Sequence, residues 1–158
     1  MTQRPVENVW DYPRPPSIEP SDEHLVVTFG GVEIADTTAS YRICETSHPP
    51  TYYLPIDSFA DGILRPIDGT TFCEWKGAAS YFDVVVGHRN IAAGAWTYQH
   101  PTARFADLLG HVAIYPAKVD SCSIDGETVQ AQGGDFYGGW ITSRVTGPFK
   151  GAPGTLGW

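Results

Sequence analysis

Apolar and polar residues alternate in short runs along most of the chain, and glycine-containing turns separate many of these runs. The clearest pair is LVVTF (25–29) and VEIA (32–35), joined by Gly30-Gly31, which is typical of a two-residue hairpin turn. The further runs are YRICE (41–45), SYFDVVV (80–86), IAAGAWTY (91–98), HVAIY (111–115), VDSCSI (119–124) and ETVQA (127–131). A GHRN turn joins SYFDVVV to IAAGAWTY, and an Asp-Gly turn joins VDSCSI to ETVQA. This spacing predicts a mainly β, antiparallel domain.

Two segments have the pattern of a short helix. They are SFADGIL (58–64) and ARFADLLG (103–110), and Gly110 would end the second. We therefore expect one or two short helices beside the sheets.

The first 20 residues differ from this pattern because they carry five prolines. Proline lacks an amide donor and fixes φ, so this arm should form neither a central strand nor a helix interior. The arm also contains Trp10 and Tyr12, two large aromatic residues that a free linker would expose. We expect it to pack along the domain and bury both.

The last stretch, residues 133–158, is rich in glycine and aromatic residues. We expect it to wrap the sheets and to be pinned by Trp140, Phe149 and Trp158. The alternative is that its backbone amides form one wall of a ligand site. In either case residues 1–158 are expected to form a single domain.

Composition and charge limit the partners. The chain has 158 residues, 42% of them hydrophobic, and a net charge of −8. Binding to nucleic acids or anionic membranes uses clustered Lys and Arg side chains. Because this chain is acidic overall, we expect neither as a partner. No apolar run approaches the ~18 residues of a membrane span, and the first residues lack the apolar centre of a secretory signal. These features predict a cytoplasmic protein, and they leave a homodimer open.

The three cysteines are widely spaced and form no CxxC pair. We expect no disulfide, no bound metal and no cofactor, because neither disulfide nor zinc spacing is present. Cys44, Cys73 and Cys122 are interpreted as small buried apolar residues.

Lysine stands twice between an aromatic residue and a glycine, in TTFCEWKGAASYF (70–82) and GPFKGAPG (147–154). An ammonium over an aromatic ring gains a cation–π attraction, and the glycine lets a ligand or another backbone approach closely. If Lys76 and Lys150 converge on one cavity with Arg42 or Arg89, they form an anion site. The alternative is that each lysine only covers an aromatic side chain.

The segment ETSHPPTYYLP (45–55) holds a second candidate group, because Glu45 and His48 are three residues apart and two prolines follow the histidine. His48 could act as a general acid or base, with Glu45 or Asp120 orienting it and Lys76 stabilising negative charge. The alternative is a structural histidine in a turn. The chain shows no paired-carboxylate motif of the kind that holds Mg²⁺, since Asp68 and Glu74 are only a weak candidate pair.

Several segments together resemble a bacterial family, the domain of unknown function 427, which is labelled nucleotidyltransferase-like. The matching pieces are VWDYPRPPSIEP (9–20), VVTFGGVEIADT (26–37), ETSHPPTYYLP (45–55), TTFCEWKGAASYFDV (70–84), AWTYQHP (95–101), HVAIYPAKVDSC (111–122) and FYGGWITSRVTGPFKGAPGTLGW (136–158). This family is similar to the β-tent proteins, which include methionine sulfoxide reductase B and the ligand-binding domain of cereblon.

The resemblance implies a tent-like fold in which two antiparallel sheets pack against each other. Many β-tent proteins hold a zinc ion with two cysteine pairs, and the zinc pins their sheets together. These pairs are missing here, so packing of the core should hold the sheets together instead. A reductase role would leave Cys122, on a predicted strand, as the cysteine to test. The transferase label implies an enzyme that uses His48 and Lys76.

We rank three functions. The first is binding of a small polar or anionic ligand in a pocket between the sheets. Its expected lining is aromatic and basic, and comprises Trp75, Tyr81, Trp96, Tyr137, Trp140, Lys76, Lys150 and His48. The second is an enzyme built on His48, Glu45 and Lys76. The third is a protein-interaction module with exposed aromatic residues as its docking patch.

Overall fold

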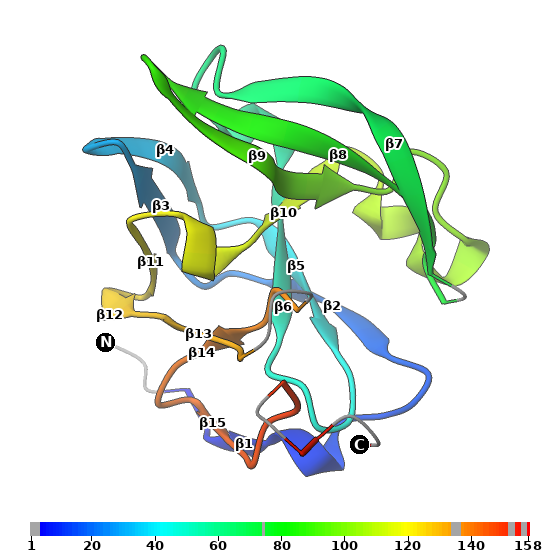
Figure 1. The fold of residues 1–158 in the computed structure, drawn as a ribbon. Coiled ribbons are helices and arrows are strands. Elements are labelled where there is room, and N and C mark those ends of the chain that lie inside the picture. Colours follow the sequence, from blue (N-terminus) through cyan, green and yellow to red (C-terminus); the bar gives the residue numbers. More distant parts are fainter. Residues whose placement is uncertain (1–3, 74, 134–136, 152–153, 156–157) are drawn as a thin grey trace.

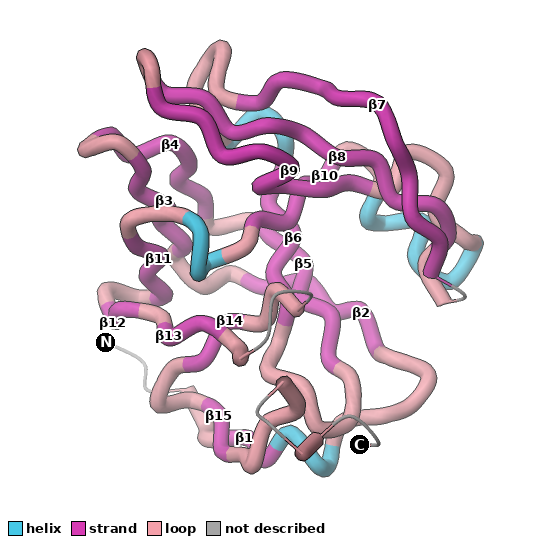
Figure 2. Tube along the Cα trace, in the orientation of Figure 1, coloured by secondary structure: helices cyan, strands magenta, loops and turns pink. Residues whose placement is uncertain are grey.

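The structure is a computed structural model and describes residues 4–73, 75–133, 137–151, 154–155 and 158. Within these residues the fold is mainly β, with a seven-stranded and a four-stranded antiparallel sheet (Figures 1 and 2). The larger sheet has the order β2 (Ser17–Ser21), β5 (Ser40–Cys44), β6 (Thr51–Pro55), β10 (His111–Ile114), β9 (Arg89–Thr97), β8 (Gly77–Val86) and β7 (Leu64–Cys73). The smaller has the order β12 (Glu127–Thr128), β11 (Ser121–Ile124), β3 (Leu25–Phe29) and β4 (Val32–Thr37).

Short pairs and 3₁₀ helices complete the described part of the chain. The pairs are β1 (Glu7–Asn8) with β15 (Val145–Thr146), which is parallel, and β13 (Gln130–Ala131) with β14 (Trp140–Ile141), which is antiparallel. The 3₁₀ helices are η1 (Val9–Asp11), η2 (Ile56–Ser58), η3 (Ala103–Leu108) and η4 (Pro116–Lys118). In the described residues, no helix has the length and apolar character that crossing a membrane would need.

The two main sheets pack against each other through one apolar core. Alternation on β3 produces it directly, because Leu25, Val27 and Phe29 are buried while the residues between them are half-buried. These side chains join buried residues of the seven-stranded sheet, including Leu54 and Val112, in a single cluster. The expected arrangement of two packed antiparallel sheets is confirmed.

The first predicted helix is wrong. Residues 56–58 form one turn of 3₁₀ helix, and β7 then begins at Leu64. The amide of Ala60 donates to the carbonyl of Ile34 on β4, which takes it out of any helical ladder. Phe59 and Ile63 are buried in the core from this irregular segment. The second predicted helix exists as η3, with 3₁₀ geometry.

The proline-rich arm lies along the domain, as expected. β2 contains Pro20 and occupies the edge of the seven-stranded sheet, where a missing amide donor costs no ladder hydrogen bond. The expected burial of Trp10 is wrong, because this side chain is 41% exposed. Its indole donates to the carbonyl of Pro148 and packs edge-on against Trp158. The arm therefore contacts the C-terminal segment as well as the sheet.

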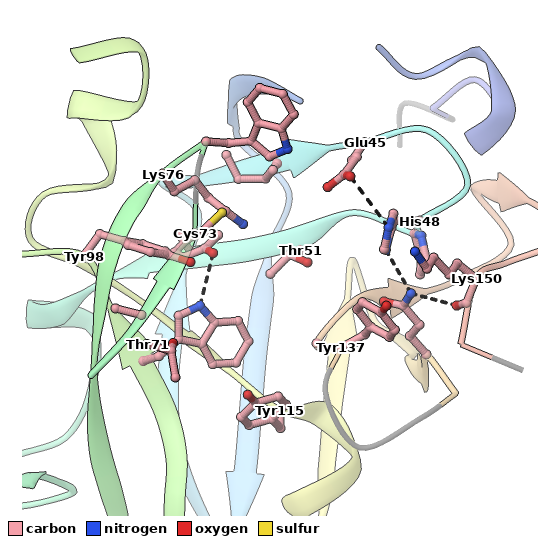
Figure 3. Close-up of a pocket in the computed structure, with 18 of the residues that line it drawn as sticks. Glu45, His48, Thr51, Thr71, Cys73, Lys76, Tyr98, Tyr115, Tyr137 and Lys150 are labelled. Atoms are coloured by element: carbon pink, nitrogen blue, oxygen red, sulfur yellow. Dashed lines mark hydrogen bonds and ion pairs between the residues drawn. The ribbon is translucent and has the colours of Figure 1, made fainter. Parts of the chain in front are cut away.

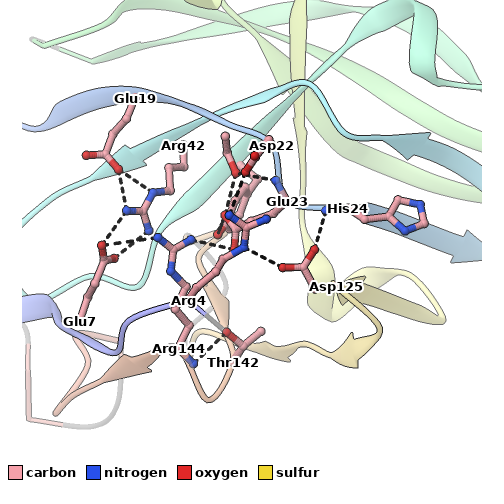
Figure 4. A network of polar contacts seen from close by, with 12 residues as sticks. Arg4, Glu7, Glu19, Asp22, Glu23, His24, Arg42, Asp125, Thr142 and Arg144 are labelled. Carbon is pink, nitrogen blue, oxygen red and sulfur yellow. Dashed lines mark hydrogen bonds and ion pairs between the residues drawn. The ribbon is translucent and has the colours of Figure 1, made fainter. Parts of the chain in front are cut away.

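A network of charged side chains fastens both ends of the chain to the sheets (Figure 4). The buried guanidinium of Arg42 on β5 donates to Glu7 on β1, at 2.8 and 2.9 Å, and to Glu19 on β2, at 2.7 Å. Arg144 pairs with Glu7 and, at 2.9 Å, with the buried carboxylate of Glu23. The guanidinium of Arg42 thus forms ion pairs with two carboxylates of this network.

Candidate functional site

A cavity of about 370 Å³ lies between the end of the β7–β8 hairpin and the loops that carry His48 and Lys150 (Figure 3). Its lining is mainly aromatic, with a few polar and basic side chains among the rings. The lining side chains include Glu45, His48, Thr51, Cys73, Trp75, Lys76, Tyr81, Trp96, Tyr98, Tyr115, Gln132, Tyr137 and Lys150. Cavities of this size are typical of small-molecule sites.

The structure brings most of the predicted site residues to this one cavity. Those that line it are Glu45, His48, Trp75, Lys76, Tyr81, Trp96, Tyr137 and Lys150. Trp140 is the exception, and its predicted place in the lining is wrong. It is 1% exposed and packs on Tyr52 in the core between the sheets, with ring centroids 5.2 Å apart.

Both lysines lie over aromatic rings, but not over their sequence neighbours. The Lys76 ammonium is 5.6 Å from the ring centroid of Tyr98, and that of Lys150 is 5.8 Å from the ring of Tyr137. These rings come from the end of β9 and from the C-terminal segment. The repeated pattern therefore picked out two lysines that line one cavity, while the rings beneath them come from elsewhere in the chain.

The glycine after each lysine permits a close approach of the chain to itself. A Cβ atom on Gly77 would lie 2.9 Å from the carbonyl oxygen of His100, and one on Gly151 would lie 2.0 Å from that of Gly133. Both glycines also have a left-handed φ, +108° and +118°. A side chain at either position would therefore displace the backbone beside the lysine.

Gln132 fixes the imidazole of His48. The side-chain oxygen of Gln132 accepts from the amide of Gly139, so its side-chain nitrogen faces the carbonyl of Lys150, at 2.8 Å, and Nδ1 of His48, at 3.1 Å. Because that nitrogen can only donate, Nδ1 must accept and Nε2 carries the hydrogen. Nε2 lies 3.8 Å from Oε2 of Glu45, beyond hydrogen-bond distance. His48 therefore presents an N–H donor.

Burial lowers the pKa of the His48 imidazole to about 4. The nearby positive charges, first Lys150 and then Arg14 and Lys76, add to this effect. The imidazole is thus neutral near pH 7, and its contact with Glu45 is not a salt bridge under those conditions.

We expect His48 to stay neutral, with its hydrogen on Nε2, at every pH above about 5. Imidazole ¹⁵N–¹³C correlation spectra check this directly, and a titration near pH 6.5 would contradict it.

The unfolded chain binds a proton at His48 near pH ~6.5, whereas the folded chain binds it near 4. The contribution of His48 to the free energy of unfolding is therefore complete above pH ~6.5 and is lost as the pH falls through 4. In His48→Gln, the free energy of unfolding should lack this part of its pH dependence.

The predicted contribution of Arg42 or Arg89 to the cavity is wrong. Arg42 belongs to the carboxylate network, and Arg89 lies over the ring of Phe29 and 3.8 Å from Asp120. Asp120 also accepts the amide of Gly31, so it does not orient His48. The basic residues that line the cavity in the described part of the chain are Lys76, Lys150 and His48.

The cysteines divide into two groups. Cys44 and Cys122 are buried, and burial raises the pKa of each thiol to about 12, which makes both inert. Cys122 is therefore a wrong choice as a reactive candidate. Cys73 is half-buried and lines the cavity, so its interpretation as a buried core residue is wrong. In the described residues, no group of three His, Cys, Asp or Glu side chains could hold a metal ion.

Sequence reasoning missed Tyr98, Tyr115 and Gln132. Tyr98 could have been found, because it stands two residues after Trp96 and so lies on the same side of an extended chain. Gln132 carried no sequence pattern. Its importance comes from burial, at 3% exposure, and from the hydrogen bonds that it makes to three separate segments.

The family model described as a domain of unknown function, DUF427, matches residues 17–125, more than half of the chain. A comparison with curated proteins found no match. The matched region contains Lys76 and His48, whereas Gln132 and Lys150 lie beyond it.

Proposed function

The chain belongs to the domain of unknown function 427 family, and from its site we propose that it binds a small anionic ligand in the cavity that Lys76 and Lys150 share. The observation that carries this proposal is the presence of both ammonium groups in one aromatic-lined cavity of a protein whose net charge is −8. Natural ligand sites combine such apolar walls with a few convergent polar groups.

Charge favours an anion over a cation. An aromatic cavity can bind cationic ligands through the faces of its rings, but here two of the rings already have a lysine over them. His48 adds an N–H donor rather than an acceptor. Among the described lining residues Glu45 is the acidic one, and it lies 3.8 Å from the guanidinium of Arg14.

Acid–base catalysis is the weaker alternative. A general base needs a free lone pair, and the lone pair of His48 is on Nδ1, which accepts from Gln132. Catalysis by His48 would require this hydrogen bond to break. The geometry therefore favours binding over a reaction that uses His48 as its base.

Binding of benzoate, phenyl phosphate and inorganic phosphate, measured by calorimetry or NMR titration, tests the proposal. The double variant Lys76→Ala/Lys150→Ala should bind these anions at least about tenfold more weakly, since a charge-assisted hydrogen bond contributes about 1.5–3 kcal/mol. Lys118→Ala is the matched control, because Lys118 also lies over a cavity tyrosine, 4.6 Å from the ring of Tyr115, but does not itself line the cavity. Equal affinity of the double variant and the wild type would overturn the proposal.

A further inference from the structure

The two lysines reach the cavity from opposite sides, with Thr51 between them (Figure 3). A single compact anion could neutralise one of them and leave the other without a negative partner from the ligand. We propose that the ligand carries two negative groups, one at each end of a flat unsaturated body, so that Lys76 binds one end and Lys150 the other. This inference rests on the proposed function and names the class of ligand.

At the Lys76 end, hydrogen bonds hold the hairpin tip, and no ion pair with a described residue balances the lysine. Thr102 holds the hairpin tip on both sides of the lysine, because its hydroxyl donates to the carbonyl of Trp75 at 2.6 Å and its amide donates to that of Lys76 at 3.1 Å. No carboxylate of the described residues lies within ion-pair distance of the Lys76 ammonium. A half-buried cation that pairs with no described carboxylate favours a negative group at this end.

Hydrogen bonds also hold the Lys150 end, which is a separate group of donors. The amide of Lys150 donates to the carbonyl of Ser47, and its own carbonyl accepts from Gln132. Its ammonium donates to the main-chain oxygen of Trp158 at 3.2 Å, and an ammonium has three donors in total. The imidazole of His48 lies near Lys150 (Figure 3), and its Nε2 is on the side of Glu45, 3.8 Å from Oε2. This end therefore offers the remaining N–H donors of the Lys150 ammonium to a second negative group.

Aromatic rings line the space that the body of the ligand would fill. Trp96 and Tyr115 lie side by side, with centroids 4.5 Å apart, and Tyr81 is held by a hydrogen bond of 2.7 Å to Thr71. Rings of this kind bind flat unsaturated groups by stacking or edge contacts. The volume of about 370 Å³ is adequate for a body of one or two fused rings.

Matched aromatic acids test this arrangement. The probes are terephthalate and naphthalene-2,6-dicarboxylate, each compared with its monoamide, which has the same shape and one negative charge fewer. For whichever length fits, the wild type should bind the dicarboxylate at least about tenfold more tightly than the monoamide. In Lys76→Ala, and separately in Lys150→Ala, this preference should shrink to within about threefold, because one end of the site has lost its cation.

Lys118→Ala is again the control and should keep the full preference. The trans form of cyclohexane-1,4-dicarboxylate tests the flat body; it should bind about threefold or more weakly than terephthalate, because aromatic contacts contribute about 0.5–1.5 kcal/mol. Equal binding of dicarboxylates and monoamides by the wild type would overturn the inference and leave the proposed function intact. So would failure of both dicarboxylates to bind while the simple anions do. Failure of every anion to bind would overturn the proposed function as well.

Discussion

Replacing Trp140 with alanine should lower the free energy of unfolding by about 3–5 kcal/mol. The side chain is 1% exposed, packs against Tyr52 and belongs to the core that joins the two main sheets. Truncation would leave a cavity that rigid strands on both sides cannot fill. Denaturant unfolding followed by circular dichroism measures the change.

Two further variants calibrate this loss of stability. Trp140→Phe should cost much less, because it keeps a ring and removes an indole N–H for which the described residues supply no acceptor. It also keeps the test valid if the alanine variant does not fold. Phe72→Ala should change stability by less than about 0.5 kcal/mol, since Phe72 is 78% exposed. A loss below about 1 kcal/mol for Trp140→Ala would show that Trp140 is not a core residue.

Among the described glycines of the C-terminal segment, Gly151 should lose the most stability when it is replaced by alanine. The new Cβ would sit 2.0 Å from the carbonyl oxygen of Gly133, and φ is +118°. We expect a loss of about 1–3 kcal/mol from backbone strain and another about 1–3 kcal/mol from overlap. Because Gly151 follows Lys150 directly, affinity for phenyl phosphate should fall as well.

Gly154→Ala is the matched control for this variant. Gly154 lies in the same segment with φ +85°, but a Cβ atom there would meet no atom of the described residues within 4 Å. It should therefore show the strain component alone, about 1–3 kcal/mol, with unchanged affinity. If the two alanine variants are equally stable by denaturant unfolding, the close approach of Gly151 to Gly133 is not real.

The sequence predicted the fold best where one face of a strand is buried. Alternation identified β3 because Leu25, Val27 and Phe29 enter the core while Val26 and Thr28 do not. β7 (Leu64–Cys73) was missed because it is an edge strand, mostly exposed on both faces, and so has no apolar period. The helix expected over 58–64 failed because its apolar residues reach the core from an irregular segment.

The sequence indicated which types of residue line the cavity, but not which side chains contact one another there. Aromatic-Lys-Gly spacing drew attention to Lys76 and Lys150, and the structure places both at one cavity. Their ring partners, Tyr98 and Tyr137, come from other segments, which local spacing cannot reveal. Gln132 sets the tautomer of His48 only because the chain folds back over a long separation in sequence. Contacts of this kind depend on the tertiary fold.

A crystal structure of the protein with phenyl phosphate bound tests most directly whether this cavity is the anion site. We expect one molecule in the cavity, with a phosphate oxygen about 2.7–3.2 Å from Nζ of Lys76 or Lys150 and its ring among the aromatic side chains. A structure in which the phosphate binds elsewhere on the surface, with neither lysine in contact, would contradict the proposal.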